Sequence, residues 1–195
     1  MIDVDFSLKL IKWYLENKRD LPWRMTKDPY HIWISEIILQ QTRVNQGLPY
    51  YFRFSEKFPN VASLANADEE EVLKLWQGLG YYSRARNLHY TAKYVSNKLD
   101  GKFPDKYNDL IKLKGIGEYT AAAISSFAFN EKRAVVDGNV FRVLSRYFGL
   151  FDAIDSSKGK KKFQELAFKN LPKINIDTYN NGIWSFTVQT GKSKL

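Results

Sequence analysis

Hydrophobic residues recur at intervals of three and four along nearly the whole chain, and strand-like alternation is almost absent. This spacing places apolar side chains on one face of a helix. Glycines and prolines interrupt the pattern and separate the helical segments from one another. The pattern therefore predicts an all-α protein with short connections, with helices at residues 5–18, 30–45, 47–57, 68–77, 82–98, 105–113, 118–129, 138–148, 159–171 and 177–186.

Composition adds limits to this picture. The 195 residues are 44% hydrophobic, which is enough for one substantial core or for two lobes. Lys and Arg number 30 against 21 acids, and the net charge of +9 favours a polyanionic partner, because contacts with phosphates release counterions. The sequence has no cysteine, which excludes disulfides and thiolate-bound metal sites within it. No apolar run is long enough to cross a bilayer, so we expect no membrane association.

A glycine-containing turn between two predicted helices is the first candidate binding site. It reads Leu-Lys-Gly-Ile-Gly-Glu-Tyr-Thr over residues 113–120. Two glycines around one apolar residue allow a sharp turn with outward N–H groups, and the next helix adds the positive end of its dipole. The segment therefore predicts a phosphate-binding hairpin at Lys114, Gly115 and Gly117, although an ordinary corner between helices has the same pattern.

Two acids are candidates for catalysis. Asp137 follows an apolar run and is expected to cap the next helix, a common structural role. Backbone N–H groups at that position also keep a carboxylate ionised, as the stabilisation of a cation requires. Between Ile32 and Leu39 only Ser35 and Glu36 are polar, so we expect Glu36 to be partly desolvated. Desolvation raises the pKa of a carboxyl group and suits it to donate a proton; the alternative is an ordinary surface acid.

Three more segments accompany the hairpin and the two acids: Leu-Pro-Trp-Arg at 21–24, Leu-Gln-Gln-Thr at 39–42, and Gly-Leu-Gly-Tyr-Tyr-Ser-Arg-Ala-Arg-Asn-Leu at 78–88. In this order they resemble the adenine DNA glycosylases, which belong to the helix-hairpin-helix glycosylase superfamily together with endonuclease III. The resemblance runs from about residue 8 to residue 180. It implies a helix-hairpin-helix DNA glycosylase fold, in which two helical lobes flank a DNA-binding cleft. A six-helix lobe at about 25–135 would be inserted between the N-terminal helix and the C-terminal helices of 136–195.

The resemblance also implies an activity. Members of this family remove adenine mispaired with 8-oxoguanine or guanine, after the adenine has been flipped out of the duplex. By similarity, Glu36 would protonate the adenine at N7, and Asp137 would stabilise the oxocarbenium-like sugar before water attacks. Tyr119 and Asn139 would support Asp137 and the water. The expected partner is double-stranded DNA containing a mispaired adenine, bound by a monomer at the nucleoid in a bacterial cytoplasm.

Further residues are assigned to the DNA by resemblance alone. Trp23 and Arg24 match positions that line the adenine pocket, and Gln41 and Tyr81 match residues that wedge into the duplex. Asn181 stands where Gln or Glu usually touches the adenine. Without the resemblance, core packing would account for the aromatic side chains and solvated surface charge for the arginines. The remaining positions expected to contact DNA are Gln40, Thr42, Leu79, Arg84, Arg86, Lys114, Gly115 and Gly117.

Tyr119 separates two branches of the superfamily. Endonuclease III-like enzymes carry a lysine there that forms a Schiff base with the sugar, and a tyrosine cannot form that imine. We therefore expect a monofunctional glycosylase. The alternatives are an endonuclease III-like enzyme for oxidised pyrimidines and a catalytically impaired helix-hairpin-helix DNA-binding remnant. A helical protein-interaction module would leave the basic charge and the two acids unexplained.

The C-terminal part departs from the family pattern. Tyr179-Asn180 still matches, but the segment 182–190 does not lead to the four cysteines that hold a 4Fe–4S cluster, nor to the domain that reads 8-oxoguanine. We therefore expect a C-terminal end that is truncated or frameshifted. We also expect no iron–sulfur cluster in this chain and no side-chain metal site. A monovalent cation on the hairpin carbonyls is the one ion that the resemblance allows.

Overall fold

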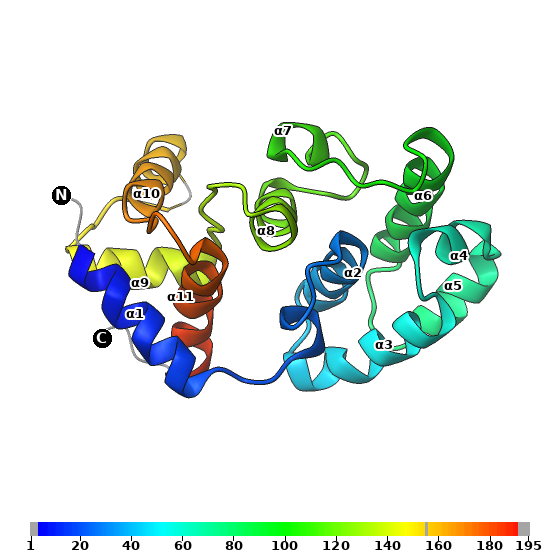
Figure 1. The fold of residues 1–195 in the computed structure, drawn as a ribbon, viewed down its shortest axis with the longest axis horizontal. Coiled ribbons are helices and arrows are strands. Elements are labelled where there is room, and N and C mark those ends of the chain that lie inside the picture. The colour runs from blue at the N-terminus through cyan, green and yellow to red at the C-terminus, as the bar shows by residue number, and fades with distance from the viewer. Residues whose placement is uncertain (1–3, 155, 191–195) are drawn as a thin grey trace. The chain divides into compact units, whose positions relative to one another are not determined.

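The computed structural model describes residues 4–154 and 156–190, and among these residues all regular structure is helical (Figure 1). The all-α fold is therefore confirmed. The helices are α1 (Val4–Asn17), the 3₁₀ turn η1 (Pro22–Arg24), α2 (Pro29–Leu39), α3 (Val44–Lys57), α4 (Val61–Asn66), α5 (Glu69–Trp76), α6 (Ser83–Lys98), α7 (Tyr107–Leu110), α8 (Glu118–Phe129), α9 (Gly138–Phe148), α10 (Ser157–Lys169) and α11 (Ile176–Thr190). No helix in the described ranges combines the length and the apolar character that a bilayer crossing needs.

The chain forms two compact units, each with its own hydrophobic core. Unit 2 is the continuous segment 21–129, and unit 1 combines residues up to 20 with residues from 130 onward. The resemblance implies limits at about 25 and 135 for the six-helix lobe.

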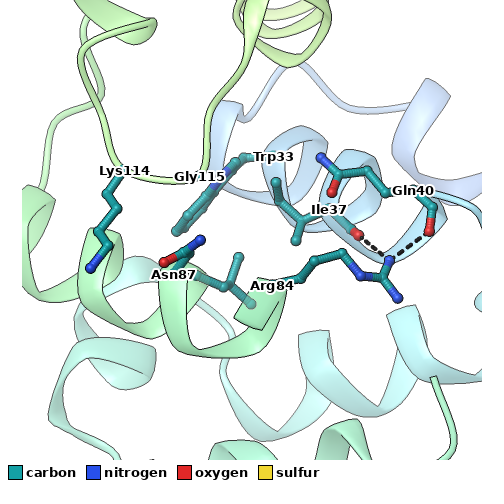
Figure 2. Close-up of a pocket in the computed structure, with 8 residues that line it drawn as sticks. Trp33, Ile37, Gln40, Arg84, Asn87, Lys114 and Gly115 are labelled. Carbon is teal, nitrogen blue, oxygen red and sulfur yellow. Dashed lines mark hydrogen bonds between the residues drawn. The ribbon is translucent and has the colours of Figure 1, made fainter. Parts of the chain in front are cut away.

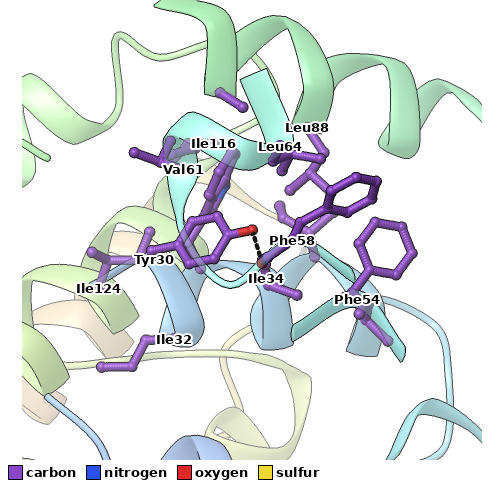
Figure 3. Close-up of a cluster of buried hydrophobic side chains, with 14 of the residues drawn as sticks. Tyr30, Ile32, Ile34, Phe54, Phe58, Val61, Leu64, Leu88, Ile116 and Ile124 are labelled. Atoms are coloured by element: carbon purple, nitrogen blue, oxygen red, sulfur yellow. Dashed lines mark hydrogen bonds between the residues drawn. The ribbon is translucent and has the colours of Figure 1, made fainter. Parts of the chain in front are cut away.

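Helix α2 runs through the core of unit 2. Most of its residues are buried on every side of the helix, from Tyr30 to Ile38. Its start is fixed by Pro29 at the first position and by Asp28, whose carboxylate accepts a hydrogen bond from the Tyr30 amide at 2.9 Å. Tyr30 donates its hydroxyl to the Phe58 carbonyl oxygen at 2.7 Å, as Figure 3 shows, so its one polar atom is satisfied inside the core.

Small side chains let α8 pack closely against α2. Every residue of α8 from Thr120 to Ser126 is buried, and three consecutive alanines lie in that stretch. The rest of unit 2 surrounds this pair: α3 packs on α2, α4 and α5 pack on α6, and α7 packs on α8. The central position of α2 fixes the environment of Glu36, which lies on this helix.

The two ends of the described chain meet in unit 1. Helix α1 packs on α11, and α9 packs on both α10 and α11. The buried ring of Phe6 contacts the rings of Tyr147, Phe148 and Tyr179, at centroid distances of 4.5, 5.4 and 6.2 Å. Ser7 donates its hydroxyl to the Asn170 carbonyl oxygen at 2.7 Å. These contacts tie the N-terminal helix to the C-terminal ones.

The main differences from the predicted helices are two helices that are shorter than expected and one that was not predicted. The helix expected at 30–45 ends at Leu39, because Gln41 adopts a positive φ of 55° that breaks the helix. The short helix α4 was not predicted, although Asn60 and Ser63 form a capping box at its start. The helix expected at 105–113 is regular only from Tyr107 to Leu110.

Candidate functional site

Glu36 is half-buried on α2. The residues on either side of it, Ser35 and Ile37, are buried, and so is Trp33. Glu36 is thus a partly exposed residue between buried neighbours on α2, and the desolvation of its carboxyl group stays a prediction.

Asp137 forms the start of α9 in unit 1. Its Oδ1 accepts hydrogen bonds from the backbone amides of Asn139 and Val140, both at 2.9 Å. The side-chain amide of Asn139 donates to Oδ2 at 3.1 Å. The predicted cap is confirmed, and Asn139 supports the carboxylate directly. Three N–H donors thus fix the orientation of this half-buried group.

Asn180 secures the segment that leads into Asp137. Its Oδ1 accepts from the Val135 amide at 3.2 Å, and its Nδ2 donates to the Arg133 carbonyl oxygen at 2.9 Å. The side chain is 2% exposed. The sequence matched Asn180 to the family pattern but gave it no role, because its partners lie far away along the chain. The neighbouring Asn181, expected to touch adenine, is half-buried on the same helix.

The hairpin has the conformation that its two glycines suggested. Gly115 has a φ of +79°, and a Cβ there would lie 2.7 Å from the Cβ of Asn87, so only glycine fits. Thr91 donates its hydroxyl to the Lys114 carbonyl oxygen at 2.7 Å. The ammonium group of Lys114 lies 4.6 Å from the centroid of the Tyr90 ring. Gly117 has open space around it, and α8 begins directly after it.

A small cavity of about 70 Å³ lies beside the hairpin (Figure 2). Side chains from α2, α6 and the hairpin line it: Trp33, Ile37, Gln40, Arg84, Asn87, Leu88, Lys114 and Gly115. Trp33 Nε1 and Arg84 Nε are buried without a hydrogen-bond partner in the described part of the chain. A polar cavity of this size has room for water molecules.

Two loops of unit 2 present exposed side chains on unusual backbone. Gln41, after α2, has a φ of 55°, and Tyr81, before α6, has a φ of 47°. Both are exposed, and 68% of the Tyr81 surface is accessible. Gln40 donates its amide to the Thr120 hydroxyl at 3.5 Å, and the Thr42 hydroxyl donates to the Gln40 carbonyl oxygen at 3.2 Å.

The two arginines of α6 lie in different surroundings. Arg84 is half-buried, and its guanidinium donates hydrogen bonds to the backbone carbonyls of both loops. Burial lowers the pKa of Arg84 from its ordinary value. Arg86 is exposed and lies 3.5 Å from Glu69. The exposed Arg86 can therefore still contact a DNA phosphate, as expected. The Nη atoms of Arg84 already donate to carbonyl oxygens.

The other predicted residues of unit 2 lie in or near its core. Trp23 is 7% exposed, and its ring centroid lies 5.0 Å from that of Tyr51. Leu79 is also buried, whereas Arg24 and Tyr119 are half-buried. Core packing accounts for Trp23 as the structure stands, and its place in an adenine pocket stays a prediction.

The candidate catalytic residues divide between the units. Glu36 and Tyr119 belong to unit 2, whereas Asp137 and Asn139 belong to unit 1. Their joint action on one nucleotide stays a prediction. Within residues 4–154 and 156–190, no group of three or more His, Asp or Glu side chains could hold a metal ion.

Comparisons with known proteins identify the family of the chain. Residues 34–172 match the family of HhH-GPD superfamily base excision DNA repair proteins. An adenine DNA glycosylase from Buchnera aphidicola subsp. Acyrthosiphon pisum is 41% identical over 179 residues, which cover 91% of this chain and 51% of the relative. The chain thus spans about half the length of this curated relative.

Solved structures share the fold. The structure of a thermostable thymine-DNA glycosylase is 30% identical with a TM-score of 0.88, and the match covers 96% of this chain and 87% of that one. A non-covalent endonuclease III–DNA complex is 22% identical with a TM-score of 0.81, over 99% and 89% of the two chains. The chain belongs to the HhH-GPD superfamily of base excision DNA repair proteins.

Proposed function

We propose that the protein hydrolyses the N-glycosidic bond of adenine mispaired with 8-oxoguanine or guanine. The observation that carries this proposal is the Asp137 carboxylate, held by three N–H donors at the start of α9. A carboxylate fixed in this way is suited to stabilise positive charge on a sugar. The choice of adenine is supported by the Buchnera relative, which is named an adenine DNA glycosylase.

The proposed reaction divides the work between the two acids. Glu36 donates a proton to N7 of the adenine, so that the bond from N9 to C1′ breaks and its electron pair leaves with a neutral base. The sugar becomes oxocarbenium-like, and Asp137 stabilises its positive charge. Water then adds to C1′ and loses a proton, leaving an abasic site and free adenine.

Tyr119 supports a monofunctional reaction. A phenol cannot form the imine that a lysine forms with the opened sugar. The proposed product is therefore an intact strand with an abasic site. The endonuclease III-like alternative requires strand cleavage through such an imine.

The proposed partner is duplex DNA containing the mispair, bound by one copy of the chain. The net charge of +9 and the hairpin at residues 113–117 support it, since both favour phosphate contacts. We also propose that the hairpin carbonyl oxygens bind a monovalent cation. The Leu113 and Lys114 carbonyl oxygens each accept a hydrogen bond, from the Ile116 amide and the Thr91 hydroxyl, and each keeps a second lone pair.

A second candidate substrate is thymine. The 30% identical relative is a thymine-DNA glycosylase, so thymine opposite guanine has to be compared with adenine directly. The higher identity to the Buchnera adenine DNA glycosylase favours adenine.

A panel of duplexes under single-turnover conditions tests the proposal. We expect alkali-labile sites from adenine opposite 8-oxoguanine or guanine, little product from thymine opposite guanine or from an oxidised pyrimidine, and little borohydride-trapped adduct. Faster release of thymine would assign the thymine reaction instead. Efficient trapping would support the endonuclease III-like alternative, and tight binding without any cleavage would support the DNA-binding remnant.

A further inference from the structure

The Arg84 guanidinium joins the two loops that carry Gln41 and Tyr81. Its Nη1 donates to the carbonyl oxygens of Gln40 at 2.6 Å and Ile37 at 3.0 Å, bonds that Figure 2 draws. The same nitrogen lies 3.3 Å from the Ile38 carbonyl oxygen. These are carbonyls at the C-terminal end of α2, which have no partner further along the helix.

The other terminal nitrogen of Arg84 holds the second loop. Nη2 donates to the carbonyl oxygens of Leu79 at 3.1 Å and Gly80 at 3.3 Å. The guanidinium carbon lies 5.0 Å from the centroid of the Trp76 ring, and Trp76 Nε1 donates to the same Gly80 oxygen at 2.9 Å. One side chain therefore binds carbonyls that lie some forty residues apart in sequence.

These bonds hold the backbone directly before the exposed side chains of Gln41 and Tyr81. The Gln40 carbonyl belongs to the peptide unit that enters Gln41, and the Gly80 carbonyl belongs to the one that enters Tyr81. Both following residues have positive φ values, of 55° and 47°, which residues other than glycine rarely adopt. Such conformations persist only where the surrounding structure enforces them.

We propose that Arg84 is a positioning residue that holds Gln41 and Tyr81 as one preformed wedge. The proposal rests on the proposed function, in which these two side chains enter the duplex where the base has left. Preformed loops spare the protein the entropy of ordering them on DNA. Arg84 therefore acts through the loops it holds, and phosphate binding is left to other cations such as Arg86.

Arginine is required for this role by its shape. The planar guanidinium donates in several fixed directions at once, whereas a lysine ammonium is a compact charge that cannot span both loops. Arg84→Lys therefore keeps the charge and removes the link. Arg146, which is exposed on α9, provides a matched control as Arg146→Lys.

Hydrogen exchange of the free protein tests the link without reference to any activity. The amides of Thr42 and Leu79 are hydrogen-bonded within the two loops and report on them. We expect Arg84→Lys to raise exchange at both loops by about tenfold or more, as for a local opening. Arg146→Lys and Arg86→Met should keep the parent's protection there. Parent-like protection in Arg84→Lys would overturn the proposal.

Base flipping tests the consequence for function. Fluorescence of 2-aminopurine opposite 8-oxoguanine is measured at saturating protein, together with the dependence of affinity on salt. Arg84→Lys should flip the base about tenfold more slowly, with an unchanged slope of log affinity against log salt concentration. Arg86→Met should reduce the magnitude of that slope by about one, because one phosphate contact is lost. Parent-like flipping in Arg84→Lys, or a reduced salt slope in this variant, would contradict the proposal. If the parent itself neither flips nor cleaves, the proposed function fails, and hydrogen exchange still decides the role of Arg84.

Discussion

In unit 2, Glu36 leaves the middle of a helix whose neighbouring residues are buried, whereas in unit 1 Asp137 stands at a helix end and accepts three hydrogen bonds. The residues that flank Glu36 along the helix are mainly buried and apolar. The Asp137 carboxylate is surrounded by donors that the backbone and Asn139 provide. Environments of these two kinds suit a proton donor and a stabiliser of positive charge.

The two acids also differ in how much they contribute to folding besides their proposed roles in the reaction. Asp137 completes the first turn of α9, so its side chain contributes to folding as well as to the proposed reaction. Glu36 lies in the interior of α2, whose N-terminal cap is Asp28, and the helix is held mainly by its buried apolar residues. Substitutions should therefore affect stability at one site and leave it nearly unchanged at the other.

Removal of the cap is the larger of two expected stability effects. Asp137→Ala should lower the free energy of unfolding by about 1–2 kcal/mol, because two amides of α9 lose their acceptor. Asp137→Asn should stay within a few tenths of a kcal/mol, since asparagine caps about as well. Urea unfolding followed by circular dichroism measures both variants.

A second cap provides the control. Ser156 accepts a hydrogen bond from the Gly159 amide at 3.0 Å, and Ser156→Ala should cost about 1 kcal/mol without any link to catalysis. Glu36→Gln should change stability by less than about 0.5 kcal/mol. A loss from Glu36→Gln as large as that from Asp137→Ala would break the comparison between the two acids.

A smaller expected effect is a loss of stability at acidic pH, which arises from a buried histidine in the core of unit 2. His89 is 1% exposed in unit 2, and burial, followed by the charge of Lys93, lowers its pKa. Below the ordinary histidine pKa of about 6.5 the unfolded chain binds a proton that the folded chain resists, so stability falls as the pH drops below about 6.5. The slope from this group has a ceiling of about 1.4 kcal/mol per pH unit.

Chemical denaturation between pH 5 and pH 8 measures this slope. Replacement of the buried ring in His89→Gln should flatten the dependence above about pH 5, whereas His31→Gln, at the half-buried histidine of α2 that bonds Asp28, serves as the control for the other histidine. An equal pH dependence in the parent and in His89→Gln would contradict the assignment.

Much of the fold followed from local pattern. The apolar run at 30–39 predicted the buried helix α2, and Asp137 before residues 138–148 predicted the capped helix α9. The end of α2 could not be predicted, because residues 40–45 contain no proline or glycine and the break depends on the distant Arg84. Local spacing carries no information about such a contact.

For the candidate site, too, the sequence suggested local contacts but not distant ones. Asp137 and its partner Asn139 are two residues apart, so the sequence could suggest their association. Asn180 and Arg84 act on backbone atoms 44 to 47 residues away, and neither role has a sequence signature. Gly115 was predictable as a turn, but the contact with Asn87 that excludes any larger residue required the structure.

The most direct test of the two-carboxylate account is single-turnover cleavage of adenine opposite 8-oxoguanine by the parent, Glu36→Gln, Asp137→Asn and the double variant. We predict losses of about 10²–10⁴-fold for Glu36→Gln and about 10²–10³-fold for Asp137→Asn, with DNA binding retained and a double loss smaller than the product of the two. Glu56→Gln, an exposed acid on α3, should cleave at the parent's rate. Parent-like cleavage by either carboxylate variant would contradict the account.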